Sequence, residues 1–184
     1  MAQYTKKAIL MTFQEMLLKL PFDKITVSAI VARCEISSNT FYYHFHDIYD
    51  LLNAWLLLRQ EKYLAMIDEH DWRDIARVLL CDLKEHPELV YHLFNYLSRE
   101  RLERFVFESS DDTIYRLVCR QTADVDIPES ELRAIAEYNG YSFLGFLLKF
   151  LWNGMEDDVD YILDTFGAIF ENNIRWLREK YSNK

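Results

Sequence analysis

Glycine and proline are scarce in this chain. Its 184 residues include only four glycines and three prolines, and all four glycines lie in the last quarter. A sheet protein with many tight turns needs more of both, so the scarcity excludes a turn-rich β fold and predicts an all-α protein. Hydrophobic residues make up 51% of the chain, which is enough to bury a core and argues against disorder.

Several functional signals are also missing. The sequence contains no apolar run of 18 residues and no secretory leader at its start, so we expect a cytoplasmic protein with no membrane partner. The three cysteines, Cys34, Cys81 and Cys119, lie too far apart for a zinc motif or a disulfide framework. No glycine-rich phosphate loop and no cluster of histidine with carboxylates occurs, so we expect no enzyme, no metal and no cofactor.

Two short motifs could suggest chemistry and do not support it. His44 and His46 are two positions apart, so on a helix their side chains point to different faces and cannot share a metal. The sequence GYSFLG at 140–145 resembles a nucleophile elbow, but it is one residue too long and no strand precedes it.

The charge is unevenly distributed. The net charge is −9, yet residues 1–50 hold five basic and five acidic residues, while the remainder holds 16 basic and 25 acidic. An acidic body repels a polyanion, so any contact with nucleic acid is expected in the first fifty residues.

Apolar spacing and capping residues predict helices along the whole chain. A first helix over 6–20 ends at Pro21, and a short one follows a Thr26 cap. After the turn at 34–36, Ser37 or Ser38 caps a third helix that ends near His44. Further helices are predicted from Ile48 to about His70, after an Asp47 cap, and over 71–86, 87–97, 109–123, 127–154 and 157–181.

The second and third helices, both short and joined by a tight turn, form a predicted helix-turn-helix supported by the first helix. In such a motif the second helix enters the DNA major groove with its N-terminal residues facing base edges. Ser38, Asn39 and Thr40 supply short polar side chains there, and asparagine can bridge N6 and N7 of adenine. We expect the rings of Tyr42, Tyr43 and His44 to pack on the first helix while their polar atoms reach phosphates.

The stretch ITVSAIVARCEISSNTFYYHFHDIYDLL, residues 25–52, resembles the DNA-binding segment of the tetracycline-repressor (TetR) family. The matching positions are Thr26, Val27, Ile30, Ser37, Thr40, Tyr42, His44 and Phe45, with Ile36 and Phe41 as near equivalents. The resemblance implies an N-terminal DNA-binding domain over 1–48 and a helical ligand-binding and dimerisation domain over 49–184. It also implies DNA contacts by Lys24, Thr26, Ser37, Ser38, Asn39, Thr40, Tyr42, Tyr43 and His44.

Two positions depart from the family pattern. The usual turn glycine is Glu35, which must take a positive φ or change the turn, and the lysine that usually opens the fourth helix as a phosphate contact is Ile48. Both changes weaken attraction to phosphates, so we expect weaker DNA binding than in a typical member.

For the body, the resemblance implies a homodimer through the last two helices, with Phe143, Phe146, Leu147, Phe150, Phe166, Ile169 and Phe170 at the interface. It also implies an effector of unknown identity, a small molecule. The side chains that could line its site are Tyr63, Trp72, Tyr91, His92, Tyr96, Tyr115, Cys119, Tyr138 and Tyr141.

These features favour a DNA-binding transcriptional regulator: a ligand-responsive repressor that binds a palindromic, double-stranded operator as a homodimer. Two alternatives stay open at this point. One is an adaptor protein that keeps the fold and has lost operator binding, which Glu35, Ile48 and the neutral head motivate. The other is a helical enzyme, which the missing catalytic constellation disfavours.

Overall fold

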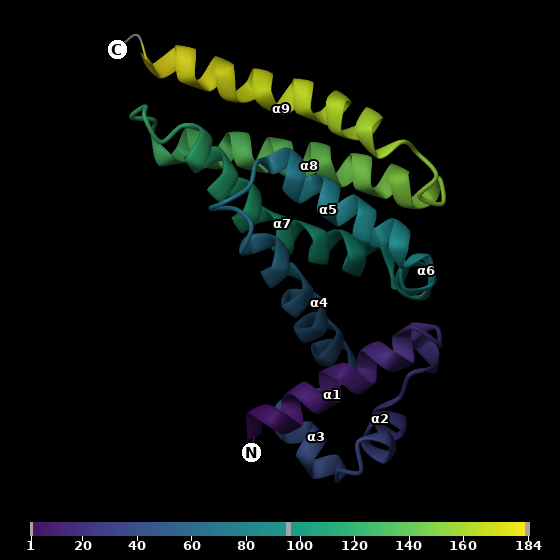
Figure 1. Ribbon diagram of the computed structural model, residues 1–184. Helices are drawn as coiled ribbons and strands as arrows, with labels where there is room; N and C mark the ends of the chain where they lie inside the picture. Colours follow the sequence, from purple (N-terminus) through teal and green to yellow (C-terminus); the bar gives the residue numbers. More distant parts are fainter. Residues whose placement is uncertain (1, 95–96, 183–184) are drawn as a thin grey trace. The chain divides into compact units, whose positions relative to one another are not determined.

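The computed structural model describes residues 2–94 and 97–182, and all regular structure in these ranges is helical (Figure 1). The elements are α1 (Ala2–Leu17), the short 3-10 helix η1 (Phe22–Lys24), α2 (Val27–Arg33), α3 (Ser38–His44), α4 (Ile48–Leu64), α5 (Trp72–Glu85), α6 (Pro87–Phe94), α7 (Arg99–Gln121), α8 (Glu129–Trp152) and α9 (Val159–Ser182). The predicted all-α fold is therefore confirmed. Within the described ranges no helix combines the length and apolar character needed to cross a bilayer.

The chain divides into two compact units. The first comprises residues 1–61 and 86–102, and the second comprises 62–85 and 103–184. Both α4 and α7 are therefore divided between the two units, and each unit is described by itself. Whether 1–48 and 49–184 behave as separate domains stays a prediction.

The first unit folds around aromatic side chains. Phe13 of α1 lies edge-on to Phe22 and to Trp55 of α4, with ring centroids 6.2 Å apart in both pairs. The indole N–H of Trp55 donates to Oε1 of Gln14 at 3.3 Å, so the buried ring keeps a hydrogen bond. Phe41 of α3 has no exposed surface. Burying a phenylalanine stabilises a fold by about 1.5–3 kcal/mol, so these rings hold α1, α3 and α4 together.

The second unit packs α5, α7, α8 and α9, with α5 and α8 both against α9. Phe166 of α9 lies at its centre, 5.5 Å from Phe143 and 5.7 Å from Trp72 between ring centroids. Arginines of α5 pair with carboxylates of α9: Arg77 with Asp160 at 2.6 Å and Arg73 with Asp164 at 3.0 Å. Aromatic packing and ion pairs thus fix α5 along α9.

The first helix, predicted over 6–20, is Ala2–Leu17, and two other predicted boundaries are wrong by a larger margin. The helix from Ile48 ends at Leu64 rather than near His70, and residues 65–70 form turns. The Arg120 side chain donates to the carbonyls of Ile67 and His70, with 2.8 Å to the latter, which holds this segment in turns. α7 begins at Arg99, ten residues before the expected start, where Ser98 Oγ accepts from the Arg101 N–H at 3.3 Å.

Candidate DNA interface and body cavity

The turn before α3 is built by backbone hydrogen bonds around Glu35. Its φ is 54°, so it takes the positive value that the sequence required of it. The Ile36 N–H donates to the Val31 carbonyl at 3.2 Å, and the Glu35 N–H to the Ala32 carbonyl at 3.4 Å. This pair of bonds is the Schellman ending of α2, in which the left-handed residue is usually glycine. The chain therefore makes the helix-turn-helix corner with a strained, charged residue.

Both short helices have the predicted caps. Thr26 Oγ1 accepts from the Ala29 N–H at 3.2 Å, and Ser37 Oγ accepts from the Thr40 N–H at 3.1 Å. The Ser37 and Thr40 hydroxyls lie 2.8 Å apart and share a further hydrogen bond. Ser37 therefore starts α3, which leaves its hydroxyl less available for an outside partner.

The outer face of α3 is polar and exposed. Ser38 and Asn39 are exposed, and so are Tyr42 and Tyr43, at 57% and 78%. They occupy positions i, i+1, i+4 and i+5, so they share one side of the helix. Thr40 lies half-buried between this face and the core. The reading face thus consists of two short polar side chains and two phenol rings.

The expected packing of Tyr42, Tyr43 and His44 on the first helix is wrong. Phe41 and Phe45 fill the core beside α1 instead, at 0% and 2% exposure, while His44 is half-buried. The helix period explains the difference, because the side of α3 that carries Phe41 faces inward and the tyrosines lie on the other side.

The start of α4 is acidic. Asp47 Oδ1 accepts from the Tyr49 and Asp50 N–H groups, both at 2.8 Å, and Asp50 Oδ2 accepts from the His46 N–H at 2.8 Å. Ile48 packs against the core of the first unit. The position that carries a lysine in the family pattern is therefore a packing residue here, between two capping carboxylates.

Cations near the reading face are few. Lys24 is exposed and pairs with Asp23 at 3.3 Å, and the Lys6 ammonium lies 5.6 Å from the centre of the Phe45 ring. Thr26, at the N-terminus of α2, is exposed. Helix N-termini and hydroxyls bind phosphate oxygens, so this part of the surface can position a DNA backbone.

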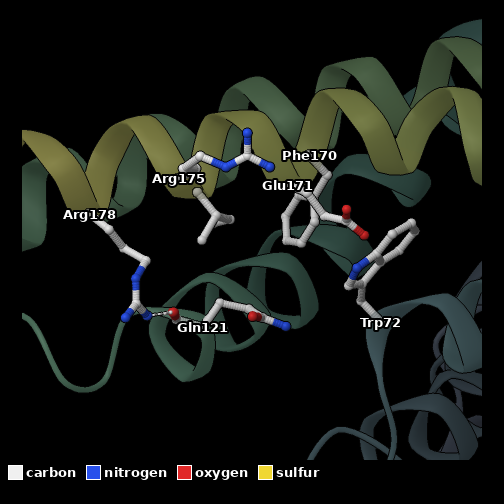
Figure 2. Close-up of a pocket in the computed structure, with 7 residues that line it drawn as sticks. Trp72, Gln121, Phe170, Glu171, Arg175 and Arg178 are labelled. Carbon is white, nitrogen blue, oxygen red and sulfur yellow. Dashed lines mark hydrogen bonds between the residues drawn. The ribbon is translucent and has the colours of Figure 1, made fainter.

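A cavity of about 310 Å³ opens in the second unit between α9, the start of α5 and the end of α7 (Figure 2). The residues that line it are Trp72, Gln121, Phe170, Glu171, Ile174, Arg175 and Arg178. In Figure 2, Trp72 and Glu171 lie at one end, and Arg178 reaches toward Gln121 at the other. Apolar rings with a few charged groups are typical of a small-molecule site.

Most polar groups at this cavity already have partners. Arg178 donates to both carboxylate oxygens of Asp124, at 2.8 and 2.6 Å, and to the Gln121 carbonyl at 2.7 Å. The hydrogen bond from Arg178 holds the pKa of Asp124 below its ordinary value. Glu171 accepts from Arg73 at 3.2 Å, and hydrogen bonds to Asp164 and then Glu171 raise the pKa of Arg73.

The side chains proposed from the sequence for ligand binding do not gather in one site, although Tyr115 and Cys119 are neighbours. Only Trp72 lines the cavity. Tyr91 and His92 belong to the first unit, where His92 Nδ1 lies 2.7 Å from the Leu17 carbonyl oxygen. Tyr138 and Tyr141 are exposed at 57% and 54%.

The remaining candidates have other neighbours. The Tyr63 hydroxyl donates to Asp82 at 3.2 Å. The Arg133 guanidinium carbon lies 4.5 Å from the centre of the Tyr115 ring. A hydrogen bond with Cys119 raises the pKa of Tyr115. Tyr96 lies outside the described residues. Within the described part of the chain, no group of three or more histidine, cysteine, aspartate or glutamate side chains is placed to hold a metal ion.

The α9 and α7 residues of the cavity were not predicted from the sequence. Glu171, Arg175 and Arg178 occupy adjacent turns of one helix side, a spacing that the sequence shows. Nothing in the sequence places that side opposite Trp72 and Gln121, which are distant along the chain.

Four of the seven proposed dimer-interface residues are buried inside the subunit: Leu147, Phe150, Phe166 and Phe170. They form its core and are not available to a second copy. Phe143 and Phe146 are half-buried against Phe166, and Ile169 is 37% exposed. The large apolar side chains exposed on α8 and α9 are instead Tyr138, Tyr141, Trp152, Tyr161, Ile169 and Trp176.

Comparison with protein families gives two matches. A family described as "Bacterial regulatory proteins, tetR family" matches residues 15–55, and one described as "Transcriptional regulator C-terminal region" matches residues 70–172. The second match alone covers more than half of the chain. No curated protein matches the sequence.

Solved structures share the fold at low identity. The dihydroxyacetone kinase operon activator DhaS is 19% identical over 94% of this chain and 97% of its own, with a TM-score of 0.66. A TerR/AcrR family transcriptional regulator from Aquifex aeolicus VF5 is 19% identical over 91% and 98%, with a TM-score of 0.56. NalD from Pseudomonas aeruginosa is 16% identical over 94% and 98%, with a TM-score of 0.58.

Proposed function

Because the chain belongs to the tetR family of bacterial transcriptional regulators, we propose that it binds a palindromic operator as a homodimer and that a small molecule in its body changes this binding. The observation that carries the proposal is the exposed polar face of α3. Phe41 anchors the helix from inside, and Ser38, Asn39 and the two tyrosines point outward. A helix held in this way can enter a major groove with its N-terminal side chains against base edges.

The composition of α3 sets the bases that it reads. Its sequence, SNTFYYH, contains no arginine or lysine, which are the usual partners of guanine. Asn39 can pair with N6 and N7 of adenine, and the Thr40 methyl can contact a thymine methyl. We therefore propose that A·T pairs dominate the part of each half-site that α3 reads.

A dimer follows from the geometry of DNA. Two recognition helices that read successive major grooves must lie about 34–36 Å apart, which requires a second copy. The exposed rings on α8 and α9 suit this contact, with Trp152 at 59%, Tyr161 at 70% and Trp176 at 52% exposure. Tyrosine and tryptophan are enriched at protein interfaces because they combine apolar area with a polar atom. We propose these residues, in place of the buried phenylalanines, as the dimer contact.

We propose repression as the regulatory outcome, since a dimer seated on a promoter excludes the polymerase. Among the structures with this fold, NalD is named as a secondary repressor of the MexAB-OprM efflux pump and DhaS as an operon activator. Transcription of the adjacent genes, measured with and without this protein, tests whether it represses or activates them. Higher transcription in its absence supports repression, and lower transcription refutes it.

Operator binding is tested by a mobility shift with the DNA that flanks the gene of this protein. The Asn39→Ala variant should lose about fivefold or more in discrimination between operator and random DNA, since a bidentate base contact contributes about 1–3 kcal/mol. Its affinity for random DNA should stay close to that of the wild type. Asn53→Ala removes an exposed asparagine of α4 and is the matched control. If Asn39→Ala leaves discrimination intact, α3 is not the reading helix.

A second candidate function is an adaptor that has the fold and has lost operator binding. The carboxylates of Glu35, Asp47 and Asp50 near the reading face favour it, because they oppose the phosphate attraction that supplies most non-specific affinity. Mobility shifts at low and at moderate salt separate the two functions. Absence of any shift at low salt supports the adaptor, and a shift at both salt concentrations refutes it.

A further inference from the structure

We propose that the cavity beside Trp72 binds a small aromatic carboxylate and that Arg175 pairs with its charge. This inference deepens the proposed function, on which its regulatory part rests, by naming the chemical class of the effector. The cavity volume of about 310 Å³ lies at the small end of ligand sites and fits a molecule of one or two rings.

The charge preference follows from which groups at the cavity are already paired. Arg178 is held by Asp124 and the Gln121 carbonyl, and Glu171 is held by Arg73. Arg175 is exposed, and within the described part of the chain it has neither an ion pair nor a hydrogen bond. It is therefore the guanidinium at the cavity that can give both donors to a carboxylate, and such pairs are commonly bidentate.

The apolar part of the ligand would lie against Trp72, Phe170 and Ile174. Trp72 and Phe170 are 4% and 2% exposed, with ring centroids 5.4 Å apart, so they form a fixed apolar surface rather than a mobile one. A planar ring can contact the exposed edges of these side chains. An amphipathic anion satisfies both parts of the cavity, with its charge at Arg175 and its ring at the apolar surface.

The position of the cavity connects it to the chain that leads to the reading helix. Trp72 is the first residue of α5, and the segment before it joins α5 to α4, which follows α3. Arg120 holds that segment through the Ile67 and His70 carbonyls, and its neighbour Gln121 lines the cavity. A ligand lodged between Trp72 and Gln121 contacts the first residue after the α4–α5 connection and the direct neighbour of Arg120, which holds that connection. It can then favour one arrangement of α4 by the difference in its affinity for the two states.

Binding is tested with naphthalene-2-carboxylate and its neutral isostere naphthalene-2-carboxamide, by calorimetry on the full chain. We expect the carboxylate to bind about fivefold or more tightly than the amide, because charge-assisted hydrogen bonds are stronger than neutral ones. Arg175→Gln should abolish this preference and leave amide binding unchanged. Arg116→Gln removes an exposed charge from α7, away from the cavity, and is the matched control. Equal binding of the two probes, no binding of either, or an Arg175→Gln variant that keeps the preference overturns the assignment.

The regulatory part is tested by repeating the operator mobility shift with saturating naphthalene-2-carboxylate. A changed operator affinity in the wild type that is lost in Arg175→Gln supports the cavity as the effector site. Operator binding that ignores a bound carboxylate refutes that role and leaves the proposed DNA-binding function intact. If the protein binds naphthalene-2-carboxylate but gives no mobility shift with DNA, the cavity assignment holds and the proposed DNA-binding function fails.

Discussion

Gly167 is the position where a single added methyl group tests the packing of α5 on α9. A Cβ built there would lie 2.6 Å from Cη2 and 2.8 Å from Cζ2 of Trp72, and 2.7 Å from Nη2 of Arg73. The arginine end can move aside. The indole is held more firmly, because it is 4% exposed and packs against both Phe166 and Phe170, with ring centroids 5.7 and 5.4 Å away.

The free-energy change for Gly167→Ala combines two opposed effects. Overpacking of a tight core costs about 1–3 kcal/mol. Alanine in place of glycine inside a helix contributes about 1 kcal/mol in the other direction. Since the rigid indole places the first effect in the upper part of its range, we expect a net loss of about 1–2 kcal/mol in the free energy of unfolding.

Gly140→Ala is the matched control. Gly140 also lies inside a helix, but a Cβ there would meet only Ile114 Cδ1, at an ordinary 3.7 Å. This variant should gain up to about 1 kcal/mol from helix propensity. Urea unfolding at several protein concentrations measures both variants and corrects for any dimer. If Gly167→Ala is as stable as Gly140→Ala, the close contact between Trp72 and α9 does not exist.

Three further predictions concern the turn, a cap and an ion pair. Glu35→Gly should raise the free energy of unfolding by about 1 kcal/mol, because it removes a side chain from a residue with a φ of 54°. It should also strengthen DNA binding by removing a negative charge. Unfolding and mobility-shift assays in which neither the free energy of unfolding nor the DNA affinity rises would contradict this. Ser37→Ala should cost about 1 kcal/mol by removing the cap of α3, and Ser38→Ala, one position later and exposed, should change stability by less than about 0.5 kcal/mol in the same assay. Arg178 lowers the pKa of Asp124, so this pair stabilises the fold at pH values above the ordinary aspartate pKa, and the stabilisation is lost as the pH falls through the lowered pKa. Asp124→Asn should therefore flatten the acid side of the curve of unfolding free energy against pH. An unchanged curve would show that the pair contributes nothing.

Local signals in the sequence predicted the helix-turn-helix segment, α2 and α3, well. The caps at Thr26 and Ser37 and the positive φ at Glu35 depend on a few neighbouring residues, and the structure has all three. The end of α4 was mispredicted because its cause is distant. Residues 65–70 continue an apolar helical spacing, and it is Arg120, some fifty positions later, that takes their carbonyls.

The reading face was predicted in part. Ser38 and Asn39 are exposed as the motif required, while the tyrosines that we expected to pack inward are exposed too. Tyr42 follows Phe41 directly, and adjacent residues on a helix lie about 100° apart, so only one of the two can face α1. Phe41 takes the inner position because it has no hydroxyl to satisfy.

Four residues of the predicted dimer interface are buried within the subunit because α8 and α9 each carry apolar residues on more than one side. A periodic pattern indicates that a helix has an apolar face, but two such faces give one nearly continuous pattern, and the pattern does not say which side meets the subunit's own core.

The residue types distinguish the two apolar sides of α8 and α9. The inward side carries Leu147, Phe150, Phe166 and Phe170, which have no polar atoms, whereas the outward side carries tyrosines and tryptophans, whose O–H or N–H groups can reach water until a partner covers the rings. Asn139 marks the boundary of the inner side: it is fully buried, it donates to the Ile135 carbonyl at 2.7 Å, and it accepts from Asn173 of α9 at 3.1 Å, so it ties the two helices together within one subunit. We therefore propose that the side of α8 and α9 with hydroxyls and indole N–H groups is the one that a second copy covers.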